Sequence, residues 1–304
     1  MNVVAKVMQL EVAMYTWQNS ERALSIARVR HATFAWSPAL GGLTYLCGNN
    51  FTTRIPTHVH STYVIGVVDD GAVRVTVRGE SFDATAGSVI AFQPFQAHAE
   101  FAAADTGWSF RYLYPTEAAV RRALGVAAKA DAVGLRFARP VIDDDSLAQS
   151  IGTVFDRLAA RRPPAETEPL LSNLFLRARQ NHCVALDTRI ERSRSRTAVR
   201  LARRTIVETP LRRLNVAQLA HDARTSQFHF NRVFREEVGL PPYAYYEQVR
   251  VARAHDMIFD GQPLSTVAYV LGFSDQAHFT RHFHRASIFT PGQYALISRD
   301  IIPR

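Results

Sequence analysis

Two nearly identical hexapeptides each place an arginine at the same position. The chain reads HFNRVF at residues 229–234 and HFTRHF at residues 278–283, with Arg232 and Arg281 as the matching arginines. In the first copy Asn231 precedes the arginine. Arginine can donate two parallel hydrogen bonds to guanine, and asparagine or glutamine can pair in the same way with adenine. The competing interpretation is that such an arginine is only solvated or pairs with a neighbouring acid.

The similarity between the two copies extends beyond the hexapeptides. At the same offset as the hexapeptides, Pro242 corresponds to Pro291 and Tyr245 to Tyr294. Upstream the offset is shorter by one residue, and Leu219-Ala220 corresponds to Val267-Ala268. This is an internal duplication of about forty residues, and a repeat of that kind takes priority in any interpretation of the fold.

Each copy predicts a helix, a tight turn and a second helix. Phenylalanines recur at helical spacing on one face of each second helix, which should therefore be buried. Gly272 allows a positive φ at the turn of the second copy. The expected N-caps are Asn215, Ser226, Ser265 and either Ser274 or Asp275. The pattern is that of a helix-turn-helix, whose second helix fits the major groove of DNA.

A further predicted helix joins the two copies. Pro242 suits its first turn, and Asp260-Gly261 should end it after Phe259. A helix over residues 242–259 would be about 27 Å long at about 1.5 Å per residue. Successive major grooves on one face of DNA are about 34 Å apart. One chain could therefore place two helices in adjacent grooves.

The charge distribution favours an anionic partner for the last third of the chain. The formal net charge is +9. Residues 190–304 contain 17 Arg and no Lys against 10 Asp plus Glu, whereas the preceding residues carry 19 basic against 17 acidic side chains. Nucleic acid is the most plausible partner for such a segment, and a basic solvated surface without a ligand is the alternative.

Composition excludes several other classes. An apolar content of 47% and a charged content of 21% are ordinary for a globular protein. Cys47 and Cys183 are too few and too far apart for a disulfide framework or a zinc-cysteine site. No segment has an uninterrupted apolar run close to the about 18 residues that a membrane-spanning helix needs. We therefore expect a cytoplasmic location without a membrane partner.

The first half of the chain has a β-like pattern. The β-branched runs VIGVV, VRVTV and SVIAF are separated by turn signals at residues 69–71, 78–80 and 86–87. Short strands at this spacing predict a sandwich or barrel.

A helical pattern follows the predicted strands. Asp143-Asp144-Asp145 provides a cap and first-turn acids for one helix, and Pro163-Pro164 breaks it. The next helix has an apolar face with Leu170, Leu174 and Phe175, which could pair two subunits or pack against the barrel.

Residues Leu214 to Ala295 resemble the DNA-binding domain of AraC/XylS-type transcription regulators. The matching residues include FNRVF at 230–234, Gly239, Pro242, Arg250, GFSDQAHFTRHF at 272–283 and Tyr294. By position in the resembled motif, the base-facing residues would be Gln227, Phe228, Asn231 and Arg232 in the first copy and Gln276, Ala277, Thr280 and Arg281 in the second. The residues placed to contact phosphates would be Arg235, His284 and Arg285.

Residues 58–71, 86–101 and 107–115 resemble the cupin-like sensor domain common in the same regulators. The resemblance implies a small-molecule pocket, and the expected effector-binding residues are His58, His60, Tyr63, His98 and Trp108. The histidines could instead satisfy local hydrogen bonds, or bind a metal, because imidazole is a common ligand for iron, zinc and copper. Metal-binding cupins typically add a glutamate after the paired histidines, and Tyr63-Val64-Ile65 stands there. We therefore expect no metal or other cofactor.

Together these patterns predict an α+β protein with two domains: an N-terminal cupin-like β-barrel, a helical linker and a C-terminal all-α double helix-turn-helix. The expected boundaries are 1–30 for an extension of unknown role, 31–115 for the effector-sensing barrel, 116–190 for the helical linker or dimerisation segment and 195–304 for the DNA-binding domain. The expected function is sequence-specific transcription regulation, as an activator or a repressor, controlled by a small-molecule effector. The expected partners are double-stranded DNA, the effector, a second copy in a homodimer, and RNA polymerase if the protein activates.

Two rival functions are also compatible with these residues. The first is a metal-dependent cupin enzyme with an appended helical domain. No nucleophile motif, phosphate-binding glycine loop or carboxylate pair is apparent in the sequence, so we expect no enzyme activity. The second is an architectural protein that binds nucleic acid without sequence preference.

Overall fold

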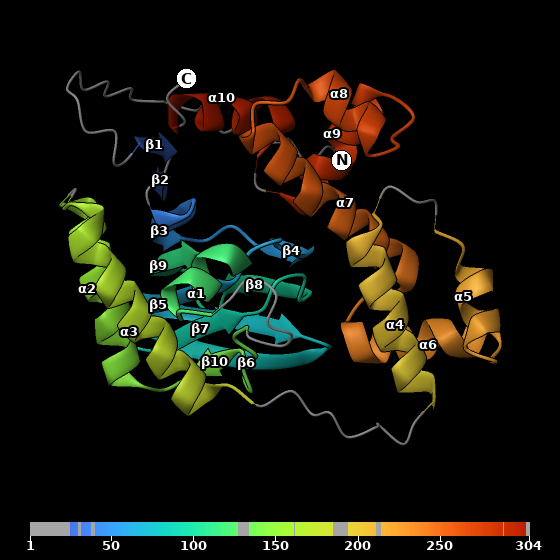
Figure 1. The fold of residues 1–304 in the computed structure, drawn as a ribbon, viewed down its shortest axis with the longest axis horizontal. Coiled ribbons are helices and arrows are strands. Elements are labelled where there is room, and N and C mark those ends of the chain that lie inside the picture. Colours follow the sequence, from blue (N-terminus) through green and yellow to red (C-terminus); the bar gives the residue numbers. More distant parts are fainter. Residues whose placement is uncertain are drawn as a thin grey trace.

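The computed structural model contains a β-rich N-terminal domain and an all-helical C-terminal domain that lie against each other (Figure 1). The expected α+β architecture with two domains is confirmed. Most of the extension expected at residues 1–30 lies outside the described residues. The structure describes residues 25–29, 32–37, 40–126, 134–160, 162–184, 194–210, 214–287 and 289–301.

The strands of the β-rich domain are all antiparallel, and they form two sheets that share β5. The first sheet has the order β1-β2-β3-β9-β5-β7-β10. In the second sheet β5 pairs with β6 on one side and with β8 on the other, and β8 also pairs with β4. Among the described strands no pairing closes this curled sheet into a complete barrel. The bounds are Ser25–Val29 (β1), Ala32–Ser37 (β2), Leu43–Phe51 (β3), Ile55–His58 (β4), Val64–Val77 (β5), Glu80–Thr85 (β6), Val89–Phe92 (β7), His98–Ala102 (β8), Trp108–Tyr114 (β9) and Val141–Ile142 (β10).

The expected turn at residues 69–71 is wrong, because VIGVV and VRVTV are two halves of the single strand β5. The register against β9 shifts between Val68 and Asp70, and Gly71 adopts φ +73°. A bulge with glycine in the left-handed region bends a strand without ending its pairing. This bend lets the first half of β5 pair with β7 and the second half with β6 and β8.

Three helices cover one face of the sheet: α1 (Glu117–Ala123), α2 (Asp145–Ala159) and α3 (Pro164–His182) (Figure 1). Asp144 caps α2 as expected, because its side chain accepts a hydrogen bond from the Leu147 N–H. Leu174 and Phe175 are buried in the core between these helices and the sheet, so the apolar face of α3 packs within the chain. The segment expected to be wholly helical also contributes β10, which pairs with β7.

The C-terminal domain contains two helix-turn-helix units joined by one long helix. Its helices are α4 (Arg194–Glu208), α5 (Val216–Asp222), α6 (Gln227–Val238), α7 (Pro242–Phe259), α8 (Leu264–Val270), α9 (Gln276–Ala286) and α10 (Pro291–Ile301). The expected bounds of α7 are confirmed, and so are the N-caps Asn215, Ser226 and Asp275. Ser265 is not an N-cap, because α8 already begins at Leu264 after Pro263.

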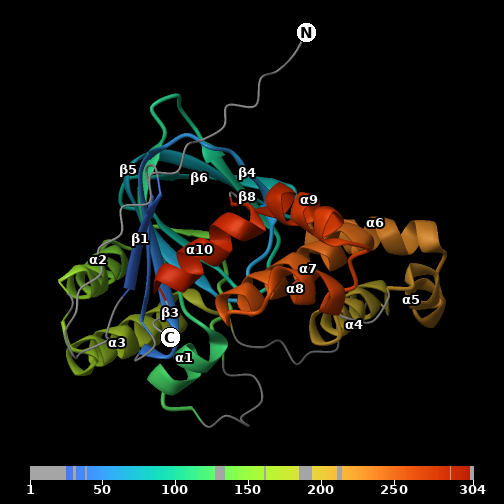
Figure 2. The same ribbon diagram turned by 90° about the horizontal axis from the view of Figure 1, so that it is seen from above.

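The two domains meet along several elements. Figure 2 shows α10 crossing β1 and α9 lying beside β4, and both pairs are in contact. Val59, Phe95 and Ala97 of the β-rich domain belong to the same apolar core as α4, α6 and the first half of α7. Among the described residues, no helix combines the length and hydropathy that a membrane crossing requires.

Gly66 near the start of β5 leads to a prediction on stability. A Cβ at this position would overlap the ring of Tyr112 and the carbonyl oxygen of Arg111 on the neighbouring strand. Because backbone cannot move aside cheaply, Gly66→Ala should lower the free energy of unfolding by about 3 kcal/mol. Gly152→Ala on α2 is the matched control. A Cβ at Gly152 would make only ordinary van der Waals contacts, and alanine stabilises a helix by about 0.5–1 kcal/mol relative to glycine. Urea denaturation of both variants measures the difference, and equal stability would contradict the overlap.

Candidate functional site

The helix α6 buries one face and exposes the side chains expected to contact DNA. Phe230, Val233 and Phe234 fill the first apolar core. The side chains expected to face DNA lie away from that core: Gln227, Phe228, Arg232 and Arg235 are exposed and Asn231 is half-buried. Phe228 is 81% exposed, which excludes a role in the core. An exposed aromatic ring on such a helix suits contact with a thymine methyl group.

The helix α9 has the same division between a buried and an exposed face. Phe279 and Phe283 are fully buried in the second apolar core. The residues expected to face DNA again lie on the other side: Gln276, Ala277, Arg281, His284 and Arg285 are exposed and Thr280 is half-buried. The hydroxyl of Thr280 donates to the Gln276 carbonyl at 2.8 Å, so it is engaged within its own helix.

The two matching arginines differ in their surroundings. Arg232 donates to Glu236 at 2.8 Å and lies 3.3 Å from the Nδ1 of His229. Within the described residues, no ion pair or hydrogen bond holds Arg281. A guanine contact would therefore require Arg232 to exchange a carboxylate for a base, whereas Arg281 has no such partner to lose.

The helix α7 connects to the second unit through Arg250. This side chain is buried, and its guanidinium stacks 4.0 Å from the ring centre of Phe273 and 5.2 Å from that of Tyr246. Burial lowers the pKa of Arg250. In the part of the chain that the structure describes, its Nε and Nη2 have no hydrogen-bond partner. Arg250 therefore contributes to structure through ring stacking.

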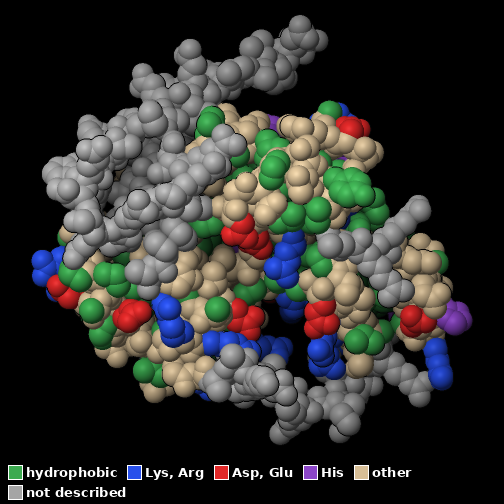
Figure 3. All heavy atoms as spheres, turned by 45° about the horizontal axis from the view of Figure 1, so that its top comes forward, with side chains coloured by type: hydrophobic (Ala, Val, Ile, Leu, Met, Phe, Trp, Pro, Cys, Tyr) green, Lys and Arg blue, Asp and Glu red, His purple; other side chains and the backbone are tan. Residues whose placement is uncertain are grey.

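The exposed face of α6 lines a hollow that also includes the β-rich domain. Gln227, Phe228, Asn231 and Arg235 lie along it, together with Arg78 of the β5–β6 turn. Figure 3 shows basic and acidic side chains interspersed over the face that it presents. Among the described residues visible in that view, positive charge is therefore not gathered into a single patch.

Three histidines from two strands of the β-rich domain meet in a cluster. His58 on β4 lies opposite His98 on β8, and His60 follows β4. Their candidate ligand atoms lie within 4.8 Å of one another. His58 is 6% exposed and His98 is 2% exposed. We call His58, His60 and His98 the histidine cluster.

Backbone carbonyls orient the rings of the histidine cluster. The Nδ1 atoms of His58 and His98 lie 2.8 Å from the carbonyl oxygens of Pro56 and Gln96. Because a carbonyl oxygen only accepts hydrogen bonds, each Nδ1 must carry the proton. The Nε2 of each ring is then unprotonated, and the Nε2 atoms of His58 and His60 are 2.9 Å apart. Burial lowers the pKa of His58 to about 4 and holds the pKa of His60 and that of His98 well below the usual value.

The structure adds residues that the sequence interpretation missed. Glu100 lies two residues after His98 on β8, so both side chains share one face of the strand. Burial raises the pKa of Glu100 to about 7, and the Tyr112 hydroxyl donates to it at 3.2 Å. The ring of Phe92 stacks on His98 with ring centres 3.8 Å apart. The alternation HAE on a predicted strand was the available signal for Glu100.

Two expected effector residues, Tyr63 and Trp108, are buried in apolar cores. Tyr63 belongs to the core beneath α1–α3, where its hydroxyl accepts a hydrogen bond from the Leu135 N–H at 3.1 Å. Trp108 is 1% exposed and packs against Phe51 and Phe110 inside the sheet. Both residues therefore contribute to packing in this structure.

The loop at residues 93–97 joins the histidine cluster to α7. The Phe95 N–H donates to the His60 carbonyl at 2.7 Å, and the Phe95 carbonyl accepts from the Tyr245 hydroxyl at 2.9 Å. Arg203 donates to the Tyr245 hydroxyl at 3.2 Å. Nearby, the Ser61 hydroxyl donates to Asp256 at 2.6 Å. We call these bonds, with the buried ring of Phe95, the domain contact.

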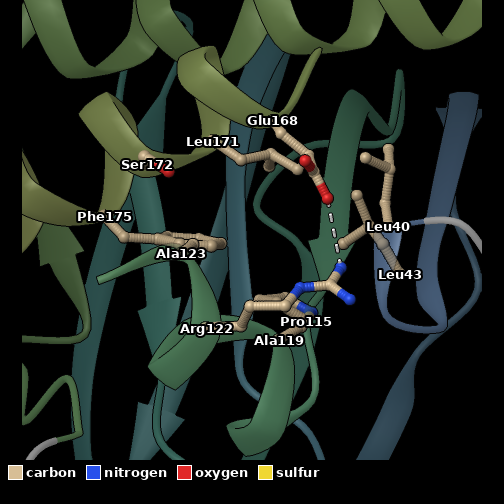
Figure 4. Close-up of a pocket in the computed structure, with 10 residues that line it drawn as sticks. All are labelled: Leu40, Leu43, Pro115, Ala119, Arg122, Ala123, Glu168, Leu171, Ser172 and Phe175. Carbon is tan, nitrogen blue, oxygen red and sulfur yellow. Dashed lines mark ion pairs between the residues drawn. The ribbon is translucent and has the colours of Figure 1, made fainter. Parts of the chain in front are cut away.

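A separate cavity of about 130 Å³ lies between α1, α3 and the start of β3 (Figure 4). Arg122 and Glu168 form an ion pair of 3.5 Å across it, and leucines and Phe175 supply apolar walls. Pockets for drug-sized ligands measure about 300–1,000 Å³. This cavity is therefore small for an organic effector, and it contains none of the clustered histidines.

The fold and these sites define a class: a two-domain protein with a double helix-turn-helix and a β-rich domain that carries a buried polar site. Family models agree, because residues 219–296 match a helix-turn-helix domain and residues 42–175 match an AraC-like ligand binding domain. The chain therefore has both domains of the AraC type of transcriptional regulator.

Individual proteins show the same likeness. The probable transcriptional regulator LumQ of Photobacterium leiognathi is 33% identical over 89 residues, which are 29% of this chain and 36% of LumQ. The chain thus spans little more than a third of that relative. The uncharacterized regulator YbfI of Bacillus subtilis is 21% identical over 74% of this chain and 81% of its own length.

Solved structures of ToxT from Vibrio cholerae share the fold. One of them, with an unsaturated fatty acid bound, has a TM-score of 0.53 at 12% identity and covers 86% of this chain and 98% of ToxT. At this identity the likeness concerns the fold alone.

The Tyr245 hydroxyl generates a prediction on the domain contact. Tyr245→Phe removes the donor to the buried Phe95 carbonyl and should lower the free energy of unfolding by about 1–3 kcal/mol. Tyr243→Phe on the same helix is the matched control, because Tyr243 is 55% exposed and should tolerate the change. Chemical denaturation compares the two variants. An equal loss of unfolding free energy in both variants would show that the hydroxyl of Tyr245 does not stabilise the domain contact.

Proposed function

We propose that the protein is a sequence-specific DNA-binding transcription regulator. The observation that carries the proposal is the pair of helices α6 and α9, each burying phenylalanines and exposing base-reading side chains, joined by α7. The 18 residues of α7 correspond to about 27 Å. The length of this spacer helix is close to the distance of about 34 Å between successive major grooves.

The proposed contacts divide into base reading and positioning. Gln227, Phe228, Asn231 and Arg232 would read one groove, and Gln276, Ala277, Thr280 and Arg281 would read the next. Arg235, His284 and Arg285 would bind phosphates and fix the register. The exposure of these side chains supports the assignment, and the engaged hydroxyl of Thr280 leaves its methyl group as the contact.

We further propose that the β-rich domain senses a small effector at the histidine cluster and biases the domain contact. A ligand that binds one arrangement of the sensor more tightly shifts the population of the whole molecule. In ToxT the bound molecule is a fatty acid. Here the buried polar groups are imidazoles, so a different effector chemistry is proposed for this chain.

The proposed DNA binding also bears on the location of the protein and on its protein partners. We propose a cytoplasmic protein that acts as a homodimer and, if it activates, contacts RNA polymerase. Leu174 and Phe175 on α3 are buried within the chain, so the proposed dimer uses another surface. We propose no enzyme activity, because the family domains concern DNA and ligand binding.

Replacement of Arg281 tests the assignment of base reading. A preferred DNA site is first selected from random sequence with the full-length protein. Arg281→Ala should then weaken binding to that site by about 1–3 kcal/mol and relax the preference at one base pair. Arg235→Ala should instead weaken all sequences uniformly and reduce the salt dependence by about one unit of slope. Fluorescence anisotropy at several salt concentrations measures both effects.

Arg204→Ala provides the control for lost positive charge. Arg204 lies on α4, outside both base-reading helices, and pairs with Glu208. Its replacement should change DNA affinity little. If selection recovers no preferred sequence, the protein is a nonspecific binder and the proposed function fails. If Arg204→Ala and Arg281→Ala weaken binding equally, Arg281 reads no base.

A further inference from the structure

The histidine cluster offers three nitrogen ligands. Three imidazoles provide candidate ligand atoms within 4.8 Å of one another, two of them from side chains at most 6% exposed. Zinc–nitrogen bonds of about 2.0–2.1 Å in a tetrahedral site separate the ligand nitrogens by about 3.3 Å. Small ring movements would therefore bring the three atoms to coordination distance.

The orientation of the rings supplies a second, independent observation. His58 and His98 donate from Nδ1 to the backbone carbonyls of Pro56 and Gln96, which directs their unprotonated Nε2 atoms away from those carbonyls. The same carbonyl contacts orient metal-ligating histidines in general. With His58 protonated on Nδ1, the Nε2–H of His60 donates to the Nε2 of His58 at 2.9 Å, so both nitrogens point into the same space and a metal ion would take the place of the shared proton.

We propose that the histidine cluster binds a divalent transition-metal ion such as Zn²⁺ through the Nε2 atoms of His58 and His98 and a ring nitrogen of His60. Imidazole ligands favour zinc and its neighbours over magnesium or calcium, which require oxygen. Three protein ligands leave a fourth position open to water or an effector atom. The inference rests on the proposed function, because it gives the sensor its ligand.

The surroundings fit an ion better than an organic molecule. Phe92 covers one face of His98, and the rings of His58 and His98 lie 4.3 Å apart. The nearby His255 on α7 is not a ligand, since its ring packs against Phe283 and Tyr294 with centres 4.3 and 4.5 Å away. The ion therefore occupies the β-rich domain alone, next to the domain contact.

Metal binding stabilises the domain contact. The carbonyl of His60 holds the Phe95 N–H, and the carbonyl of Gln96 holds the ring of His98. Ser61, next to His60, donates to Asp256 on α7. Fixing the imidazoles on one ion fixes the backbone on both sides of Phe95. A ligand that binds the folded arrangement adds its binding free energy to that arrangement.

Zinc binding to the full-length protein tests the site without DNA. After treatment with a chelator, the wild type should bind a single Zn²⁺ per chain in competition with a chromophoric chelator, and Co²⁺ should produce a visible absorption band typical of nitrogen ligands. His60→Ala should lower the zinc affinity by about tenfold or more. His60 is only half-buried, so this variant should fold, which circular dichroism verifies.

His221→Ala is the matched control, because this histidine has a side chain that is 84% exposed on α5. It should bind zinc as the wild type does. Equal zinc affinity in the wild type, His60→Ala and His98→Ala would overturn the proposal. So would the absence of stoichiometric zinc in a folded wild type, which would leave the histidines as a hydrogen-bonded cluster.

Hydrogen exchange tests the effect on the domain contact. Zinc should slow exchange in residues 93–97 and 242–259 of the wild type and leave His60→Ala unchanged. Zinc binding without slower exchange would overturn the link to α7. DNA affinity is measured separately: a protein that binds zinc but no specific DNA refutes the proposed function, and one that binds specific DNA but no zinc refutes only the metal site.

Discussion

The backbone of Phe95 is the constraint on which the relation between the domains depends. Its φ is +59°, a left-handed conformation that costs a residue with a side chain about 1 kcal/mol or more. Three contacts maintain it: the N–H donates to His60, the carbonyl accepts from Tyr245, and the ring is buried among residues of α4, α6 and α7. Because these contacts belong to both domains, the loop and α7 cannot move independently.

The helix α7 combines several roles on one rigid element. Tyr245 contacts the sensor loop, Arg250 stacks on Phe273 of the second unit, and Asp256 accepts from Ser61. The same helix sets the separation of α6 and α9. A shift of the loop that moved α7 would therefore displace α6 and α9 together. Coupling of this kind requires contiguous packing and an element with two arrangements, and the packing is present here.

Local signals explain how much the sequence could predict. Caps such as Asn215 and Asp275, the bounds of α7 and the buried phenylalanines follow from short-range geometry and were predicted correctly. The bend at Gly71 and the strained Phe95 depend on which strands and helices meet, and the sequence does not encode that locally. The grouping of His58, His60 and His98 was considered from the sequence, whereas Glu100 required knowledge that β8 turns one face inward.

The two helix-turn-helix copies are unequal in their surroundings. The core of the first includes Val59, Phe95 and Ala97 of the β-rich domain, whereas the described core of the second contains helical-domain residues alone. The first arginine is paired with Glu236, and Arg281 has no such partner among the described residues. A change at the sensor can therefore reach the first unit through this shared core, whereas the second unit contacts the β-rich domain through α9 beside β4 and α10 beside β1. The duplication therefore supplied two similar helices whose units meet the β-rich domain in different ways: the first shares an apolar core with it, and the second contacts it at β1 and β4.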